Sequence, residues 1–298
     1  MKYYIPLSAV LCLAISACGT DEPGGGDPAD KPEATAGYVP VTVIEYNPAP
    51  GQFVNEMPEY REGMTASDMT AAANSAIAAG DLVSLGGWGG YIIYRLEKYI
   101  VNRPGADFRV VGNAYYSFVK DGVQYGNCEP GVVYVMADTN GNGLPDGTWY
   151  ELIGSHTTEG RNVEVEYTQT ATETGFEINA VCSTGETQTW ISNPGFHPHS
   201  YAPLWLGESA LRFNGRLLPA NGEKMENGQY SQICYTGYAD ARPNNDEASA
   251  LDISAAIDSD GKPATLERID FIKVQTGVLQ FNGPIGECST ETGRIQAL

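Results

Sequence analysis

The sequence predicts an all-β protein, an antiparallel β-sandwich or jelly roll with one short α-helix near the N-terminus of its domain. Two observations lead to this fold class. Many short runs of β-branched and aromatic residues follow one another, and Gly, Pro, Asn or Asp residues separate nearly all of them. In addition, only one segment has the composition and the end signals of a helix.

The first predicted elements of the domain are a strand and this helix. Residues 38–46 alternate with β-branched side chains, and Pro40 places them at an edge or at the opening of a sheet because it lacks an amide hydrogen. Thr65 stands three residues before a carboxylate, as a capping box requires. The alanine-rich run 69–79 then ends at Gly80, so we expect a helix there.

The rest of the chain predicts short strands. Their ranges are 82–85, 91–96, 108–111, 132–136, 149–153, 163–167, 188–191, 210–213 and 269–276. A glycine cluster, residues 86–90, follows the first of them. It lacks the Lys-Ser/Thr ending of a phosphate-binding loop and precedes no helix, so we interpret it as a bend at a corner of the sandwich.

The N-terminal segment predicts export and lipidation. Residues 1–17 contain one charged residue, Lys2, and an apolar run too short to span a bilayer; small residues and Cys18 end the segment. This pattern is a lipobox, so we expect 1–17 to be a lipoprotein signal peptide and Cys18 to be acylated, which gives a stable anchor. An ordinary secretory signal is the alternative.

A spacer is predicted after the signal. Residues 18–37 are rich in Gly, Pro, Asp and Glu and contain almost no side chains that could pack, which is typical of a disordered tether. The acidic pair at 21–22 resembles the export signal of Bacteroidota-type surface lipoproteins, so we expect lipid anchoring on the outer membrane, facing the cell exterior. A solvated spacer is the alternative. Residues 38–298 should form a single domain, because no second low-complexity linker divides them.

Composition and motifs disfavour several functions. The formal net charge is −20 at pH 7, and such a surface repels nucleic acid and anionic headgroups. The chain has no Gly-x-Ser-x-Gly and no His-Glu-x-x-His motif, which disfavours the corresponding serine and zinc hydrolases. We expect no catalytic activity. A glycosidase stays an alternative, because it needs only two suitably spaced carboxylates.

Cysteine usage leaves two readings open. Cys12 leaves with the signal and Cys18 is acylated; the cysteines of the domain are Cys128, Cys182, Cys234 and Cys288. Four cysteines permit three pairings, and the sequence does not select among them. Free buried thiols are the alternative, because a domain of this size does not need disulfides.

The sharpest motif is the acidic loop 138–146. Oxygen-bearing side chains lie at its positions 1, 3, 5 and 9 and a glycine at position 6, as in the first part of a calcium loop. The predicted ligands of a structural Ca²⁺ are Asp138, Asn140, Asn142, Leu144 (through its carbonyl) and Asp146. Position 12 is Trp149 instead of Glu, so the loop is not an EF-hand. A metal-free loop held by Asx turns is the alternative.

Two histidines form a second candidate site. On an extended segment His197 and His199 would face the same side, as a metal pair or a ligand clamp needs, although His156 is the only other histidine in the chain. We favour an aromatic platform that combines Tyr201, Trp205 and one histidine. The alternative is that these aromatic side chains belong to the core.

A second oxygen-rich segment follows. Residues 244–247, with Asp252 beyond them, could hold another ion or offer hydrogen bonds to a ligand, or could be a solvated acidic turn.

Several sequence blocks resemble a family of secreted bacterial surface proteins. The blocks are 83–90 (Val-Ser-Leu-Gly-Gly-Trp-Gly-Gly), 100–108, 112–113, 128–133, 138–155, 237–246 and 269–277. They are similar to Bacteroidota-type cell surface lipoproteins with a galactose-binding-like jelly roll, which are often encoded beside outer-membrane nutrient receptors, including cobalamin uptake systems. The resemblance implies a jelly roll that captures a scarce nutrient, and it assigns no catalytic residue.

These observations predict a surface-exposed lipoprotein that captures a nutrient, a corrinoid or a glycan, for an outer-membrane transporter. The candidate ligand-binding residues are Trp88, His197, His199, Tyr201, Trp205, Asp240, Arg242 and Asn244. The alternatives are an adhesive or structural surface protein and a glycan-processing hydrolase.

Overall fold

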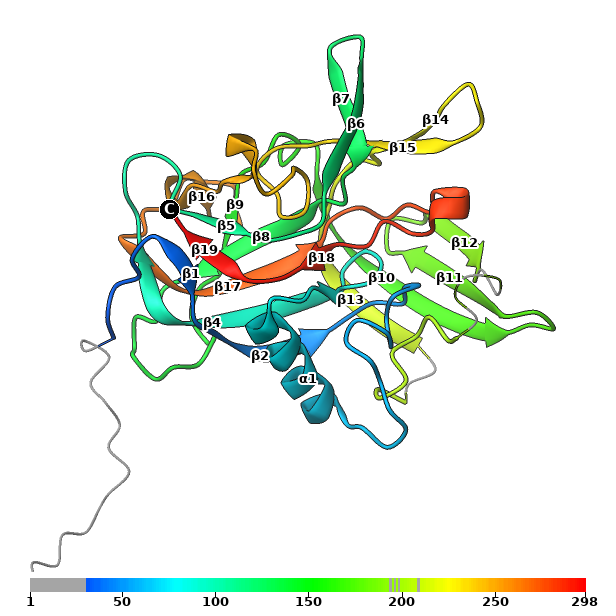
Figure 1. The fold of residues 1–298 in the computed structure, drawn as a ribbon, viewed down its shortest axis with the longest axis horizontal. Coiled ribbons are helices and arrows are strands. Elements are labelled where there is room, and N and C mark those ends of the chain that lie inside the picture. The colour runs from blue at the N-terminus through cyan, green and yellow to red at the C-terminus, as the bar shows by residue number, and fades with distance from the viewer. Residues whose placement is uncertain (1–30, 193–194, 196, 198, 208–209) are drawn as a thin grey trace, which may run out of the picture.

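The structure is a computed structural model that describes residues 31–192, 195, 197, 199–207 and 210–298. Within this part of the chain the sheets are antiparallel and α1 (Ala66–Ala79) is the single α-helix, so the all-β prediction with one helix is confirmed. Figure 1 shows the helix and the smaller sheets arranged around a central sheet. The predicted signal peptide and the lipidation site Cys18 lie outside the described residues.

A six-stranded antiparallel sheet forms the centre of the fold. Its strands run in the order β16-β9-β8-β17-β4-β2. Their bounds, in that order, are Ala256–Ile257, Tyr150–Leu152, Gly131–Met136, Arg268–Thr276, Tyr91–Val101 and Val41–Asn47. The central strand β17 is buried for most of its length, because other layers of the protein cover both faces of the sheet.

One face of this sheet carries the main apolar core. Ile272 and Val274 of β17 share this face, because successive strand residues point to opposite sides, and they pack in one cluster with Ile77 of α1. The cover consists of α1, a three-stranded sheet in the order β1-β19-β5 and the pair β3-β18. The bounds of these strands are Gly37–Val39, Ile295–Ala297, Phe108–Val110, Val83–Ser84 and Glu291–Thr292.

The helix has the predicted end signals. Thr65 is the N-cap of a complete capping box, in which its hydroxyl accepts a hydrogen bond from the amide of Asp68 and the Asp68 carboxylate accepts one from the amide of Thr65. Gly80 ends the helix in the left-handed conformation at φ +94°, which glycine adopts without a steric penalty. Local sequence is therefore sufficient to set both ends of α1.

A second sheet packs on the opposite face of the six-stranded sheet. Its order is β12-β11-β10-β13, with the bounds Thr187–Ile191, Phe176–Cys182, Arg161–Ala171 and Ala210–Leu217. Its core contains Trp88, Tyr167 and Phe213. The glycine cluster 86–90 connects β3 to β4 beside this core. A Cβ at Gly89 would lie 2.5 Å from the Cβ of Phe213, so only glycine lets the chain turn this close to the sheet.

Two hairpins build a third sheet that projects from the body (Figure 1). Its order is β14-β15-β7-β6, with the bounds Gly222–Lys224, Tyr230–Ile233, Val123–Asn127 and Tyr115–Lys120. A disulfide between Cys128 and Cys234 joins the chain directly after β7 to the chain directly after β15. Cys182 and Cys288 are free and buried, so the domain contains both one disulfide and buried thiols.

Two boundaries differ from the sequence prediction. The strand expected over 38–46 is interrupted at Pro40, which separates β1 from β2. The last part of the predicted tether also packs on the domain: the Ala34 amide donates to the Tyr99 carbonyl over 2.8 Å, and the Lys31 ammonium lies 3.4 Å from the Asp270 carboxylate. The packed domain therefore begins before residue 37.

Short 3-10 helices complete the described structure. They are Glu247–Ser249, Ile253–Ala255 and Gly283–Ile285. None of the helices within the described ranges is long and apolar enough to cross a bilayer.

Candidate ligand-binding site

A cleft of about 560 Å³ opens between the six-stranded sheet and the sheet that contains β10 and β13. We call it the polar cleft; the residues that carry its chemistry are Tyr134, Trp149, Glu151, Arg216, Lys273 and Gln275. Its volume lies in the range of about 300–1,000 Å³ that small-molecule sites occupy. The mixture of aromatic and charged side chains gives it the composition of a site for a polar ligand.

Strand alternation places the cationic side chain of Lys273 in this cleft. Lys273 and Gln275 point to the opposite side of β17 from the core residues Ile272 and Val274. The Lys273 ammonium lies over two tyrosine rings, 4.3 Å from the centroid of Tyr91 and 5.5 Å from that of Tyr134. Burial lowers the pKa of Lys273, and the Glu45 carboxylate partly offsets this shift. Its ammonium makes no hydrogen bond or ion pair to any described residue.

A buried ion pair forms the second polar feature of the cleft. Arg216 Nε lies 3.0 Å from Glu151 Oε2, and the two side chains are only 15% and 7% exposed. The other oxygen of Glu151, Oε1, is buried and has no hydrogen-bond partner among the described residues. Burial raises the pKa of Glu151, and Arg216 and then the nearby Thr157 hydroxyl partly offset this shift. The cleft therefore contains an acceptor, Glu151 Oε1, and a donor, Lys273 Nζ, that make no hydrogen bond to the described residues.

Gln275 fixes the distance between the walls of the cleft. Its amide donates to the carbonyls of Gly89 and Asn214 over 2.8 and 3.1 Å. A Cβ at Gly215 would lie 2.2 Å from Gln275 Oε1, so the absence of a side chain there lets β13 approach β17. The two sheets are thus held at a fixed spacing around the cleft.

The acidic loop 138–146 connects β8 to β9 and leads into the cleft. Asp138 accepts hydrogen bonds from the amides of Gly141 and Gly143 over 2.8 and 2.9 Å. Four residues further along the chain, Asn142 accepts one from Leu144 over 2.8 Å. The chain between this loop and β9 contains Trp149 of the cleft. The conformation of the loop therefore sets where one wall residue of the cleft lies.

The predicted calcium ligands come together in this loop. The side-chain amides of Asn140 and Asn142 donate to the two oxygens of Asp146, over 3.2 and 2.7 Å. The hydrogen bonds from Asn142 and then Asn140 lower the pKa of Asp146. Asx-type hydrogen bonds hold the loop, as in the metal-free alternative. The oxygens of Asn140 and Asn142 accept hydrogen bonds from the backbone amides of Asn142 and Leu144.

The predicted aromatic platform lies largely in the core. Trp88 is fully buried and its indole donates to the Arg216 carbonyl over 3.1 Å. Tyr201 is 2% exposed. Trp205 is half-buried and stacks on Tyr46 and Tyr60, with centroids 5.9 and 6.1 Å apart. These positions correspond to the alternative in which the aromatic side chains pack the interior, and Trp88 and Tyr201 offer no exposed face to a ligand.

The three predicted polar residues of 240–244 hold backbone segments. Asp240 is 4% exposed. Arg242 donates to the carbonyls of Cys234 and Tyr235 over 2.8 and 2.9 Å. Asn244 exchanges two hydrogen bonds with the backbone of Gly112, of 3.0 and 2.7 Å. Their hydrogen-bonding groups are engaged within the protein.

The second acidic segment caps two short helices. Asp246 accepts a hydrogen bond from the Ala248 amide over 2.8 Å, and Asp252 accepts one from the Ser254 amide over 2.7 Å. Asp246 also accepts the phenolic hydrogen of Tyr116. Such contacts are those of a capped turn.

His197 and His199 meet the carboxylate of Glu56, away from the polar cleft. His199 Nδ1 lies 3.0 Å from Glu56 Oε1, and His197 Nδ1 lies 3.8 Å from Glu56 Oε2. Burial lowers the pKa of His197, whereas Glu56 raises it in part. His156 lies elsewhere, against the ring of Tyr235. A glutamate therefore takes the third position next to this histidine pair.

The sequence alone does not predict the polar cleft. The local signal is the alternation of Lys273 and Gln275 with the apolar residues Ile272 and Val274 in the strand 269–276. Arg216 and Glu151 are 65 residues apart in the chain, so their pairing depends on how the two sheets pack.

Two comparisons with known proteins found no match to this chain. No protein-family model matches it, and neither does any curated protein. The similarity to surface lipoproteins therefore rests on the sequence blocks alone.

Proposed function

We propose that this protein is a surface-exposed lipoprotein whose polar cleft binds a glycan fragment for delivery to an outer-membrane transporter. The observation that carries this proposal is a pair of groups without hydrogen bonds to the described residues: the buried acceptor Glu151 Oε1, and the Lys273 ammonium, which lies over two tyrosine rings. Sugar hydroxyls both donate and accept hydrogen bonds, so one ligand of this class satisfies both groups. Trp149 and Tyr134 in the same cleft supply aromatic faces for the C–H side of a sugar ring.

A glycan suits the cleft better than a corrinoid does. The volume of about 560 Å³ is typical of sites for drug-sized ligands. A corrinoid is larger and amphipathic, and it would need a broad aromatic surface. Trp88 and Tyr201, which could have contributed to such a surface, are buried. Cobalamin is therefore kept as a second ligand in the test.

Three further expectations belong to this proposal. The antiparallel sheets form a galactose-binding-like jelly roll, Cys18 carries the lipid anchor, and a structural Ca²⁺ occupies the loop 138–146. The contacts of Asn140 and Asn142 with Asp146 support the ion, since they bring three of its five predicted ligand residues together. Such an ion would position Trp149 at the cleft.

A glycan-processing hydrolase is the second candidate. Burial raises the pKa of Glu151, a property of general acids in glycosidases, and Asp258 and Glu164 also line the cleft. The ion pair between Glu151 and Arg216 favours binding over proton transfer, because it stabilises the charged carboxylate.

The test is a calorimetric titration of residues 19–298 with a panel of host and plant oligosaccharides and with cyanocobalamin, in calcium buffer. Lys273→Met and Glu151→Gln should each weaken glycan binding by about 10–100-fold, the cost of losing a hydrogen bond to a charged group. Lys120→Ala, on the projecting hairpin, is the matched control and should leave affinity unchanged.

Each other outcome would contradict the proposal in a recognisable way. Cobalamin binding without glycan binding would replace the ligand class. Release of reducing sugar that Glu151→Gln abolishes would make the protein a hydrolase. Glycan binding that both cleft variants retain would move the site elsewhere.

A further inference from the structure

We propose that Glu56, His197 and His199 form a site for a divalent late transition metal ion, for which Zn²⁺ is the probe. One ligand atom from each residue lies within 4.8 Å of the other two. Tetrahedral Zn²⁺ with bonds of about 2.0–2.2 Å sets its ligands about 3.3–3.5 Å apart. The two measured Glu56–histidine separations, 3.0 and 3.8 Å, fall on either side of that spacing. None of the three residues lines the polar cleft, so this site is independent of the proposed function.

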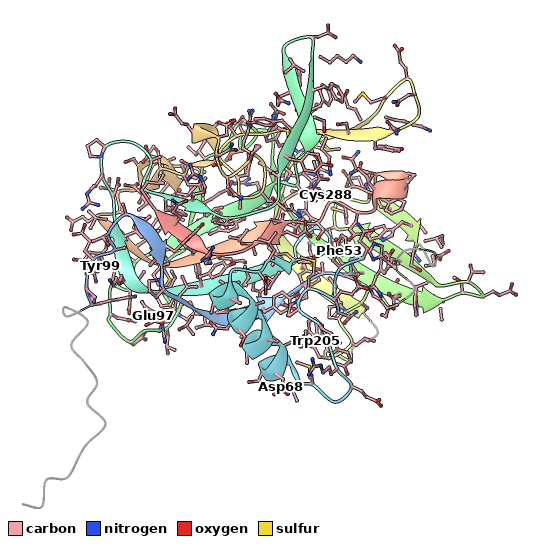
Figure 2. The ribbon with its side chains drawn as sticks, viewed as in Figure 1. Phe53, Asp68, Glu97, Tyr99, Trp205 and Cys288 are labelled. Atoms are coloured by element: carbon pink, nitrogen blue, oxygen red, sulfur yellow. A yellow bond between two sulfur atoms is a disulfide. The ribbon has the colours of Figure 1, made fainter. Side chains whose placement is uncertain are left out.

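The fold brings these ligands together from two distant segments. Asn55, next to Glu56, donates its side-chain amide to the carbonyls of Ser200 and Ala202 over 2.8 and 3.0 Å. Its side-chain oxygen accepts a hydrogen bond from the Leu204 amide over 3.1 Å. Figure 2 labels Phe53 and Trp205, which mark the two segments joined in this way. The backbone next to the site is therefore held in place before any ion binds.

His199 has the second-shell contact that zinc-binding histidines usually have. Its Nε2 lies 2.8 Å from the carbonyl oxygen of Gln52. A carbonyl can only accept, so Nε2 carries a proton, and Nδ1, which faces Glu56, is the nitrogen that can bind a metal ion. A backbone carbonyl that fixes the tautomer of a ligating histidine is a common feature of metal sites.

His197 supplies an independent observation. Its Nδ1 is buried and has no hydrogen-bond partner among the described residues, although the Glu56 carboxylate is 3.8 Å away. The Glu56 carboxylate is at hydrogen-bond distance from His199 only, and it faces His197 at the longer distance of an ion pair. An edge-to-face contact with the ring of Phe53, with centroids 4.8 Å apart, holds His197 in this orientation. A metal ion would satisfy Nδ1.

The ligand set selects the type of metal. Two imidazoles and one carboxylate suit Zn²⁺ and its neighbours in the first transition series, whereas Ca²⁺ and Mg²⁺ prefer oxygen ligands. The Glu56 side chain is 45% exposed, so solvent reaches the site. Three protein ligands leave one position for water, which is the pattern of an accessible site and not of a closed structural one.

The test measures metal binding to the whole mature chain with excess Ca²⁺ present, so that the acidic loop does not compete for the added ion. Zn²⁺ affinity comes from competition with a chromophoric chelator, and Co²⁺ gives visible absorption bands that report its nitrogen and oxygen ligands. We expect one ion per chain. His197→Gln and His199→Gln should each weaken binding by at least ~100-fold, the upper end of what losing a supporting group costs, and Glu56→Gln by at least ~10-fold.

His156→Gln is the matched control and should leave affinity unchanged, because this histidine lies against Tyr235 and Glu159. Circular dichroism without metal should be the same for all variants, which separates loss of a ligand from loss of fold. Wild-type affinity no higher than that of the His197→Gln/His199→Gln double variant would overturn the proposal. Loss of Zn²⁺ binding only in Asp138→Ala/Asp146→Ala would also overturn it, because the ion would then occupy the acidic loop.

Discussion

The polar cleft and the buried carboxylate cluster hold charge in the interior in opposite ways. The cluster consists of Glu129, Asp240 and Glu291, whose oxygens lie within 4.8 Å of one another. The cleft leaves Glu151 Oε1 and Lys273 Nζ without hydrogen bonds, beside open volume. In the cluster, by contrast, donors from the surrounding loops reach every carboxylate.

Asp240 shows how the cluster is satisfied. It accepts hydrogen bonds from the amides of Asn113, Ala114 and Glu291 over 2.8, 2.9 and 3.0 Å. Burial and the neighbouring Glu291 raise its pKa well above the usual range. Groups whose partners come from the protein itself stabilise the fold, whereas groups left open beside a cleft are available to a ligand. We therefore interpret the cluster as structural and the cleft as the place where the proposed ligand binds.

The largest effect should follow from Asp240→Ala. The substitution leaves three buried amide hydrogens without an acceptor, and each costs about 1–3 kcal/mol. We expect the free energy of unfolding to fall by about 3–6 kcal/mol in urea denaturation, with unchanged ligand affinity in whatever fraction stays folded. Asp240→Asn, which keeps an acceptor, should lose less than half as much. A loss below about 1 kcal/mol in the alanine variant would contradict a structural role for the cluster.

Arg216→Met tests the ion pair between Arg216 and Glu151 in the cleft. It leaves the Glu151 carboxylate buried without its partner, which costs about 3–5 kcal/mol. The double variant Arg216→Met/Glu151→Leu should recover most of that stability and still bind no ligand. Guanidinium denaturation and calorimetry on the same samples test both expectations. A single variant as stable as wild type would show that the pair is not desolvated.

Stability should fall as pH rises through neutrality. Burial raises the pKa of Glu287 to about 7 from an unfolded value of 4.5. Between these values the folded state binds more protons than the unfolded state, so this contribution is complete below pH 4.5 and is lost as pH rises through about 7. The shift corresponds to about 3 kcal/mol.

The melting temperature between pH 5 and pH 8 checks this expectation, with Glu287→Gln as the comparison. The variant has no titrating carboxyl at this position, so it should lose less stability than the wild type over the same interval. Parallel curves for the two proteins would refute the assignment. Glu291, whose pKa burial also raises to about 7, should contribute in the same direction within the cluster.

The smallest effect concerns the acidic loop. Asp138→Ala/Asp146→Ala should lower the melting temperature more in calcium than in chelator, because both buffers show the loss of the hydrogen bonds within the loop and only calcium adds binding free energy to the folded wild type. At ten times Kd this gain is about 1.4 kcal/mol. Glu173→Ala, at an exposed turn, is the control. Equal melting of wild type and double variant in both buffers would remove calcium from the proposal and leave Trp149 to be positioned by Asx turns alone.

Local features of the fold could be predicted from the sequence, and non-local ones could not. The capping box and Gly80 set α1 because the signal and its effect lie within one turn of the chain. The hairpin of β6 and β7 was missed although Asp121 and Gly122 both take positive φ at its turn, and Asp-Gly is a typical hairpin signal. Strand pairing across the whole chain, such as β1 with β19, has no local signature.

The same limit applies to the sites. The sequence suggested that His197 and His199 form a pair, because two residues on one strand face follow directly from alternation. It could not identify Glu56, which lies 141 residues before His197 and joins it only through the packing of two loops. Trp88 and Tyr201 illustrate the reverse case: their chemistry suits ligands, yet burial depends on neighbours that the sequence does not reveal.

The pairing of β1 with β19 brings the two ends of the domain together. Gly37 lies opposite Ala297 in the register, so the start of β1 and the end of β19 lie side by side at one corner of the domain. The domain should therefore tolerate circular permutation. A chain in which a short linker joins the present ends at this corner, and new ends open between Asp121 and Gly122, should form the same sheets. If Cys18 carries the lipid anchor proposed above, a fluorescent label fused after Leu298 would report the distance of that corner from the membrane.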